Sequence, residues 1–128
     1  MVKILYSLLA EGAVFSKSNN LTIFEIFNEI TAEQLPAVQL RTFFVCFGQF
    51  EAEEAGTVRE WAVSISAPDG NTVARPFGSI TLPTNAKSDK ITLNIQIPVI
   101  PLPVLGRYEF RLTIDGHDAS TAILDVIQ

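Results

Sequence analysis

The stretch Lys90-Ile91-Thr92-Leu93-Asn94-Ile95-Gln96-Ile97 has an aliphatic residue at every odd position and a polar or charged residue at every even one. Successive side chains of a β-strand point to opposite faces, so this alternation predicts a strand that is buried on one face only. Residues 107–114 repeat the pattern with their even positions apolar. Because the turn residues Asp115-Gly116 follow and 119–127 has the composition of a last strand, a β-hairpin is predicted at 107–127.

Strand patterns also precede this hairpin. Residues 60–66 alternate around Trp61 and end at the turn Pro68-Asp69-Gly70-Asn71. Short strands are expected near 72–75 and 79–82, beside prolines that suit sheet edges. Residues 38–50 are apolar on both faces, which predicts a central strand or a strand whose outer face is covered by a partner.

Three segments are less clear-cut. Residues 21–30 fit both helical and strand spacing, and their β-branched and aromatic residues favour a strand. A helical turn is the alternative considered at 32–35, and the proline-rich segment 98–103 is expected to be a crossover loop over the core. With a first strand at 1–10, about eight mostly antiparallel strands and no long helix result, so we expect one all-β domain spanning residues 1–128.

The order of three residues narrows the fold to an immunoglobulin-like β-sandwich. Such sandwiches carry an inward cysteine on strand B, a buried tryptophan on strand C, and a tyrosine two residues before the second cysteine on strand F. Cys46, Trp61 and Tyr108 follow this order. Phe110 stands where the second cysteine would be, so we expect packing to replace the cross-sheet disulfide.

The chain resembles a family of small bacterial β-sandwich proteins of unknown function. The resemblance is carried by residues 4–13 and 20–30, by Leu35-Pro36, by the turn Pro68-Asp69-Gly70 and by the Gly-x-Tyr-x-Phe strand at 106–110. It implies the sandwich fold and implies no activity, ligand or catalytic residue.

Composition limits the partners. The formal net charge is −5 with nine Lys and Arg scattered singly, so neither nucleic acid nor an anionic membrane surface is expected as a partner. Hydrophobic residues make up 48% and the mean hydropathy is +0.29. That apolar excess predicts a homo-oligomer or a protein partner.

Localisation is judged from the cysteine and from apolar runs. A lone Cys46 favours the cytoplasm, and no apolar run is long enough to cross a bilayer. The first ten residues resemble a weak signal sequence, but Glu11 follows them at once and Leu8-Leu9 replace the small residues of a cleavage site. A first strand is therefore the preferred interpretation.

No reacting group stands out. His117 is the only histidine, and a triad would have to combine it with Ser120 and with Asp115 or Asp118. A hairpin turn is normally exposed, so we predict no enzyme and no catalytic residue. We expect Cys46 to be a buried, inert thiol.

Cofactor and metal motifs were considered in the same way. One cysteine and one histidine are too few for structural zinc, and no phosphate-binding loop is present. A calcium site would need the turns 69–71 and 115–118 to meet at one end of the sandwich, or would use the acidic loop 51–54. The Pro-x-x-Pro spacing in 98–103 lacks the basic neighbours of an SH3 ligand. We therefore predict no cofactor and no metal site.

One segment is a candidate for function. Phe43, Phe44, Phe47 and Phe50 are expected mainly in the core, with an interface strand as the alternative. The function predicted from sequence is a non-enzymatic protein-interaction or assembly module. The alternative is a small-ligand or carbohydrate-binding β-sandwich, assisted by calcium.

Overall fold

The computed structural model describes residues 1–18, 20–84 and 88–128, and this part of the chain is almost entirely β-structure. Its only helical element is one 3-10 turn, Ala52–Glu54. The described residues form ten strands, compared with the eight or so expected: β1 (Lys3–Phe15), β2 (Leu21–Phe27), β3 (Glu29–Thr31), β4 (Ala37–Gln49), β5 (Val58–Ser66), β6 (Thr72–Ala74), β7 (Phe77–Thr81), β8 (Lys90–Leu102), β9 (Gly106–Ile114) and β10 (His117–Ile127). No helix among the described residues is long and apolar enough to span a bilayer.

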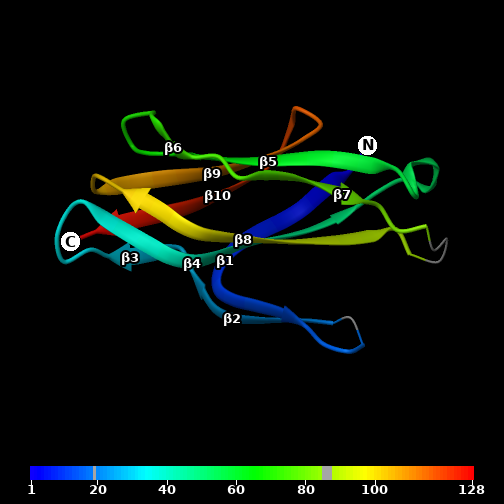
Figure 1. Cartoon of the computed structure of the whole chain (residues 1–128), viewed down its shortest axis with the longest axis horizontal. Helices are drawn as coiled ribbons and strands as arrows, with labels where there is room; N and C mark the ends of the chain where they lie inside the picture. The colour runs from blue at the N-terminus through cyan, green and yellow to red at the C-terminus, as the bar shows by residue number, and fades with distance from the viewer. Residues whose placement is uncertain (19, 85–87) are drawn as a thin grey trace.

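The strands form two sheets that face each other (Figure 1). The four-stranded sheet has the order β2-β1-β4-β8, and the six-stranded sheet has the order β3-β10-β9-β5-β6, with β7 also paired to β5. All of these pairs are antiparallel except β3 with β10. The expected hairpin at the C-terminal end is confirmed as β9 and β10.

The sheets have the strand arrangement of an immunoglobulin sandwich. Strands β1, β4 and β8 take the places of A, B and E, and β5, β9 and β10 take those of C, F and G. Tyr108 is fully buried, and its hydroxyl donates to the Val104 carbonyl at 2.7 Å and accepts from the Val104 amide at 3.1 Å. This is the tyrosine corner of the fold, and it confirms the immunoglobulin-like prediction.

Packing replaces the missing disulfide in the core. The rings of Phe44 and Phe110 lie 6.3 Å apart and 8° from parallel, beside the buried Cys46. Trp61 differs from the expectation, because it is only partly buried at the margin of the core. Its ring lies so close to Gly78, on the neighbouring strand, that a Cβ there would stand 2.7 Å from the indole.

The N-terminal half shows where local patterns were ambiguous. Residues 21–30 form strands rather than a helix, and they split at Asn28, so that β2 and β3 belong to different sheets. The helical turn considered at 32–35 is absent from the structure, which has bends there. The edge positions expected for the two short strands are confirmed, because β6 and β7 each pair with β5 alone among the described strands.

The prediction of a crossover loop at 98–103 was wrong. The segment continues β8, with Ile100 and Leu102 buried while Val99 and Pro101 are exposed. Because β8 is an edge strand, it tolerates residues that lack an amide hydrogen.

The outer face of the four-stranded sheet is partly covered by the chain itself. Strand β1 pairs with β4 through its first half and then leaves the sheet to form a hairpin with β2. The Asn94 side chain, on the outer face of β8, donates to the Ala13 carbonyl at 3.1 Å, so the second half of β1 lies over this face. Val45 points outward beside Asn94 and is nevertheless fully buried.

Candidate functional site

His117 occupies the position where catalysis would have to reside, and two of its candidate partners, Ser120 and Asp115, are engaged elsewhere. It is exposed as the first residue of β10. The Ser120 hydroxyl lies 2.6 Å from the Ser7 hydroxyl, and the Asp115 carboxylate accepts from the Glu60 amide at 2.9 Å and from Arg59 at 3.1 Å. The structure therefore does not bring the serine, the histidine and the aspartate together as a triad.

Beside His117 lies a hollow of about 400 Å³ that contains a buried carboxylate. Glu54 is 5% exposed and accepts from the Met1 ammonium at 2.7 Å, the Arg59 guanidinium at 3.1 Å and the Glu51 amide at 3.0 Å. Burial alone would raise the pKa of Glu54, but the hydrogen bonds from Met1 and Glu51 and the charge of Arg59 bring this pKa below its ordinary value.

Arg59 links this carboxylate to the next turn. Its guanidinium also contacts Asp115, whose pKa is lowered first by the Glu60 amide and then by Arg59. Arg59 thus joins the carboxylates of Glu54 and Asp115 into an ion-pair network that lines the hollow, while the buried Nε of Arg59 has no partner among the described residues.

The calcium arrangement considered from the sequence does not form. A Cβ on Gly106, at the start of β9, would stand 2.7 Å from Pro68, which places the turn 69–71 near that end. Asp115 follows Ile114 at the other end of β9. Among the described residues, no three His, Cys, Asp or Glu side chains are grouped so that they could hold a metal ion.

Two further sequence candidates are structural. Cys46 is fully buried, and burial raises the pKa of its thiol well above the usual range, as expected for an inert cysteine. The Pro-x-x-Pro spacing lies within β8 and is paired with β4, so it does not present a free polyproline helix.

The core interpretation that was preferred for the phenylalanine-rich segment holds for two of its four phenylalanines. Phe44 and Phe50 are buried, so the interface interpretation does not hold for them. Phe43 and Phe47 are half-buried on the outer face, and the Phe47 ring stacks on Tyr6 at 4.7 Å.

The two sheets differ in their exposed surfaces. Among the described residues, the strands of the six-stranded sheet expose three large hydrophobic side chains, those of Val58, Phe77 and Ile127. The strands of the four-stranded sheet expose nine: Leu5, Tyr6, Val14, Phe15, Phe24, Ile26, Val38, Leu40 and Val99. Exposed apolar surface is thus concentrated on one sheet.

Three of these apolar side chains form a patch together with the exposed Pro101, and we call the four residues the apolar quartet: Val38, Leu40, Val99 and Pro101. Leu40 is opposite Val99 and Val38 is opposite Pro101 in the β4–β8 ladder. Leu40 is 63% exposed and Val99 is 51% exposed. Directly opposed side chains on one face are in contact range, so the quartet is continuous.

The outer face of the six-stranded sheet is polar by contrast. Arg107 and Asp125 form a bidentate ion pair with contacts of 2.9 and 3.1 Å, and Arg111 lies 3.8 Å from Glu109. The partners opposite these charges on β5 are Ser64 and Ser66. This is the ordinary surface of a solvated sheet.

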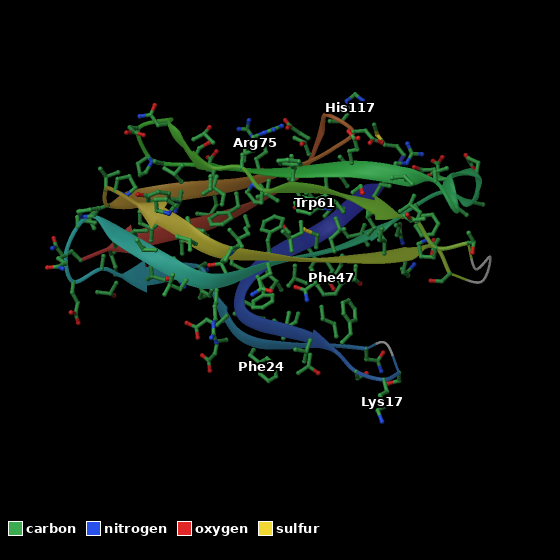
Figure 2. All side chains as sticks on the ribbon, in the orientation of Figure 1. Lys17, Phe24, Phe47, Trp61, Arg75 and His117 are labelled. Atoms are coloured by element: carbon green, nitrogen blue, oxygen red, sulfur yellow. The ribbon has the colours of Figure 1, made fainter. Side chains whose placement is uncertain are left out.

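A shallow hollow of about 510 Å³ interrupts that polar face over β5 and β7. Phe77, which is 77% exposed, pairs with the small residue Ala62 at its floor. Glu60 and Arg75 contribute charges to its lining. In Figure 2, Arg75 and His117 lie at the opposite edge of the molecule from Phe24 and Lys17.

Sequence reasoning missed the apolar quartet. It placed Val99 in a loop because prolines flank the residue, although Val99 and Pro101 alternate with the buried Ile100 and Leu102. That alternation was the available signal for a strand with an apolar outer face.

Comparisons with known proteins identify a family. Residues 5–127 match a family described as "Family of unknown function (DUF6941)". No match was found among curated proteins. A glycosyl hydrolase family 2 member from Bacteroides cellulosilyticus is similar at 16% identity and a TM-score of 0.48, over 81% of this chain and 16% of that chain.

A second solved structure is an immunoglobulin-like protein from Pseudomonas aeruginosa. It is 16% identical with a TM-score of 0.44, over 98% of this chain and 96% of that chain. At this similarity neither structure informs function, and the fold assignment rests on the strand order and the tyrosine corner of the chain itself.

Proposed function

The chain belongs to a family of unknown function (DUF6941), and we propose that it is a non-enzymatic assembly module that binds another protein chain, in the first place a second copy of itself. The observation that carries this proposal is the asymmetry between the sheets: nine exposed large hydrophobic side chains on strands of the four-stranded sheet against three on the other. Exposed apolar patches of this kind are typical of protein interfaces.

The charges of the molecule support the same function. Near His117, the side chains of Glu54, Arg59 and Asp115 are paired with one another and the Ser120 hydroxyl is bonded to Ser7, which supports a structural role for these groups. A cytoplasmic location is part of this proposal, because the single Cys46 forms no internal disulfide and so needs no oxidising environment.

Sedimentation equilibrium of the purified protein over a wide range of concentrations tests this function. We expect reversible self-association that is weakened by Leu40→Lys in the apolar quartet or by Ile26→Lys on β2. The matched control is Thr121→Lys, which adds the same charge at an exposed position of the six-stranded sheet. A protein that stays monomeric at all concentrations, or that only Thr121→Lys dissociates, would contradict the proposal.

A second candidate is binding of a small ligand or a carbohydrate at the hollow over β5 and β7. Its support is the exposed phenyl ring of Phe77 beside the small floor residue Ala62 and the charges of Glu60 and Arg75. The volume of about 510 Å³ lies in the range of small-molecule sites.

Titration with a panel of oligosaccharides, followed by NMR, tests this second function. Shifts confined to β5 and β7 that disappear in Phe77→Ala would support it. Repeating the titration with calcium present tests whether calcium assists binding. Chemical shift changes that persist in Phe77→Ala would contradict binding at the hollow.

A further inference from the structure

We propose that the free edge of β2 pairs with β2 of a second copy of this chain, so that the four-stranded sheets of two molecules continue into each other. This inference rests on the assembly function proposed above and names the surface and the occupant. Strand β2 is the terminal strand of its sheet, and among the described strands it is paired with β1 alone. One side of its backbone therefore presents unpaired amide and carbonyl groups, which a further strand can satisfy.

The edge is seven residues long and has one irregularity, at Glu25. The β1–β2 pairs run from Leu9 opposite Phe27 to Phe15 opposite Leu21 in one unshifted register. Glu25 has a φ of 53°, but the register continues across it. In Figure 1 the hairpin of β1 and β2 extends away from the other strands.

The other edge of the same sheet shows what a protected edge looks like in this molecule. Strand β8 carries two prolines three residues apart, Pro98 and Pro101, so one of them removes an amide donor from its free edge. Strand β2, with the sequence Leu-Thr-Ile-Phe-Glu-Ile-Phe, has no proline and a single charged residue. Edge strands that remain unpaired in natural proteins usually carry prolines or charged residues that prevent a further strand from pairing. The edge of β2 lacks this protection and is therefore the edge suited to pairing.

The charges at the two ends of β2 favour a second copy as the occupant. Lys17 lies in the turn before the strand and is the only Lys or Arg between residues 4 and 40. Glu29 lies two residues after the strand, as the first residue of β3, where it is opposite Asp125 of β10. Both side chains are exposed. Antiparallel pairing of two β2 strands about a twofold axis near Ile23 brings Lys17 of each copy toward the partner's Glu29, at both ends of the pair.

Side chains on the hairpin add apolar contact to the backbone pairing. Phe24 is 51% exposed and Ile26 is 63% exposed, and Figure 2 shows Phe24 and Lys17 on this hairpin. A strand pair of this length makes a small interface, so a dissociation constant of roughly micromolar order is expected.

A charge exchange tests the pairing by sedimentation equilibrium. We expect Lys17→Glu and Glu29→Lys each to weaken the dimer roughly tenfold, because each replaces two attractions by two repulsions. The double variant Lys17→Glu with Glu29→Lys restores the affinity of the unmodified protein. Lys3→Glu, which changes the net charge equally at an exposed position of β1, is the matched control and leaves the dimer unchanged.

The outcomes separate this inference from the proposed function. If the single variants associate like the unmodified protein, or if the double variant fails to restore association, pairing at β2 is overturned. When Leu40→Lys alone dissociates the protein, the assembly function stands and the β2 edge is not its surface. An unmodified protein that remains monomeric overturns both proposals.

Discussion

The outer faces of the two sheets follow different rules although their inner faces share one core. On the six-stranded sheet, the outward positions of β9 are Arg107, Glu109 and Arg111, and two ion pairs satisfy them. On the four-stranded sheet, the outward positions at the far end of β4 are Val38 and Leu40. The fold requires that the inner faces of both sheets be apolar, so only the outer faces are free to differ. The outer face of the six-stranded sheet meets water, and in our proposal the four-stranded sheet meets another chain.

The largest expected effect separates the inner from the outer face of a single strand. Phe44→Asp places a carboxylate at a fully buried site against Phe110, and we expect a loss of more than about 4 kcal/mol and an unfolded protein. Leu40→Asp, on the outer face of the same strand, should change the free energy of unfolding by only about 0.5 kcal/mol. Urea unfolding followed by circular dichroism measures both.

The comparison would break if Leu40→Asp were as destabilising as Phe44→Asp. Leu40 would then be part of the core rather than of an exposed patch. Val99→Asp is a second outer-face variant, because Val99 is opposite Leu40 in the β4–β8 ladder, and it should also change the free energy of unfolding only slightly.

A smaller effect is expected at the tyrosine corner that joins β9 to the preceding loop. Tyr108→Phe leaves the amide and the carbonyl of Val104 without the hydroxyl that bonds both. We expect a loss of about 1–3 kcal/mol in the free energy of unfolding, measured with urea, and no change in self-association. An unchanged stability would show that water replaces the hydroxyl and that the corner is not needed here.

The fold could largely be predicted because the apolar residues of the inner faces recur at every second position of the sequence. Alternation in 90–97 and 107–114 indicated two strands, and the order of Cys46, Trp61 and Tyr108 indicated the topology. The splitting of 21–30 between two sheets could not be predicted, because it depends on the parallel pairing of β3 with β10, about a hundred residues away.

The candidate surface was harder to predict than the core. An exposed valine and a buried one look alike in the sequence, and only the register of β4 with β8 shows that Leu40 and Val99 share one face. The overall apolar excess indicated a partner, but the phenylalanines that seemed to carry it proved to be mainly core or half-buried. Burial by the chain's own hairpin, as at Val45, cannot be inferred from strand patterns.

A pH-dependent effect is expected at the ion-pair network beside His117. The pKa of Glu54 is lower in the folded protein than in the unfolded chain, so at acidic pH the unfolded chain binds more protons. The stabilisation by Glu54 is therefore complete above its unfolded pKa of about 4.3 and is lost as the pH falls through the lower folded value.

Glu54→Gln measures this contribution. The difference in unfolding free energy between this variant and the unmodified protein should be largest near neutral pH and shrink below about pH 4. A difference that is constant with pH would mean that the carboxylate's charge does not contribute. Self-association should not change, because Glu54 is buried at an end of the sandwich.

The smallest effect is expected at the ion pairs on the polar face. Arg107 and Asp125 are hydrogen-bonded but lie on an exposed surface, where water and salt screen the attraction. Asp125→Asn should leave both the urea midpoint and self-association within experimental error. A clear loss of association in this variant would move the interface to the six-stranded sheet and reverse the comparison between the faces.

Hydrogen–deuterium exchange at low and high protein concentration tests the central claim most directly, because it locates an interface on the unmodified chain. We predict that amides of β2 exchange more slowly as the concentration rises, while peptides from β7, β9 and β10 keep their rates. Slowing confined to the six-stranded sheet, or no dependence on concentration anywhere, would contradict the claim that the four-stranded sheet is the association surface.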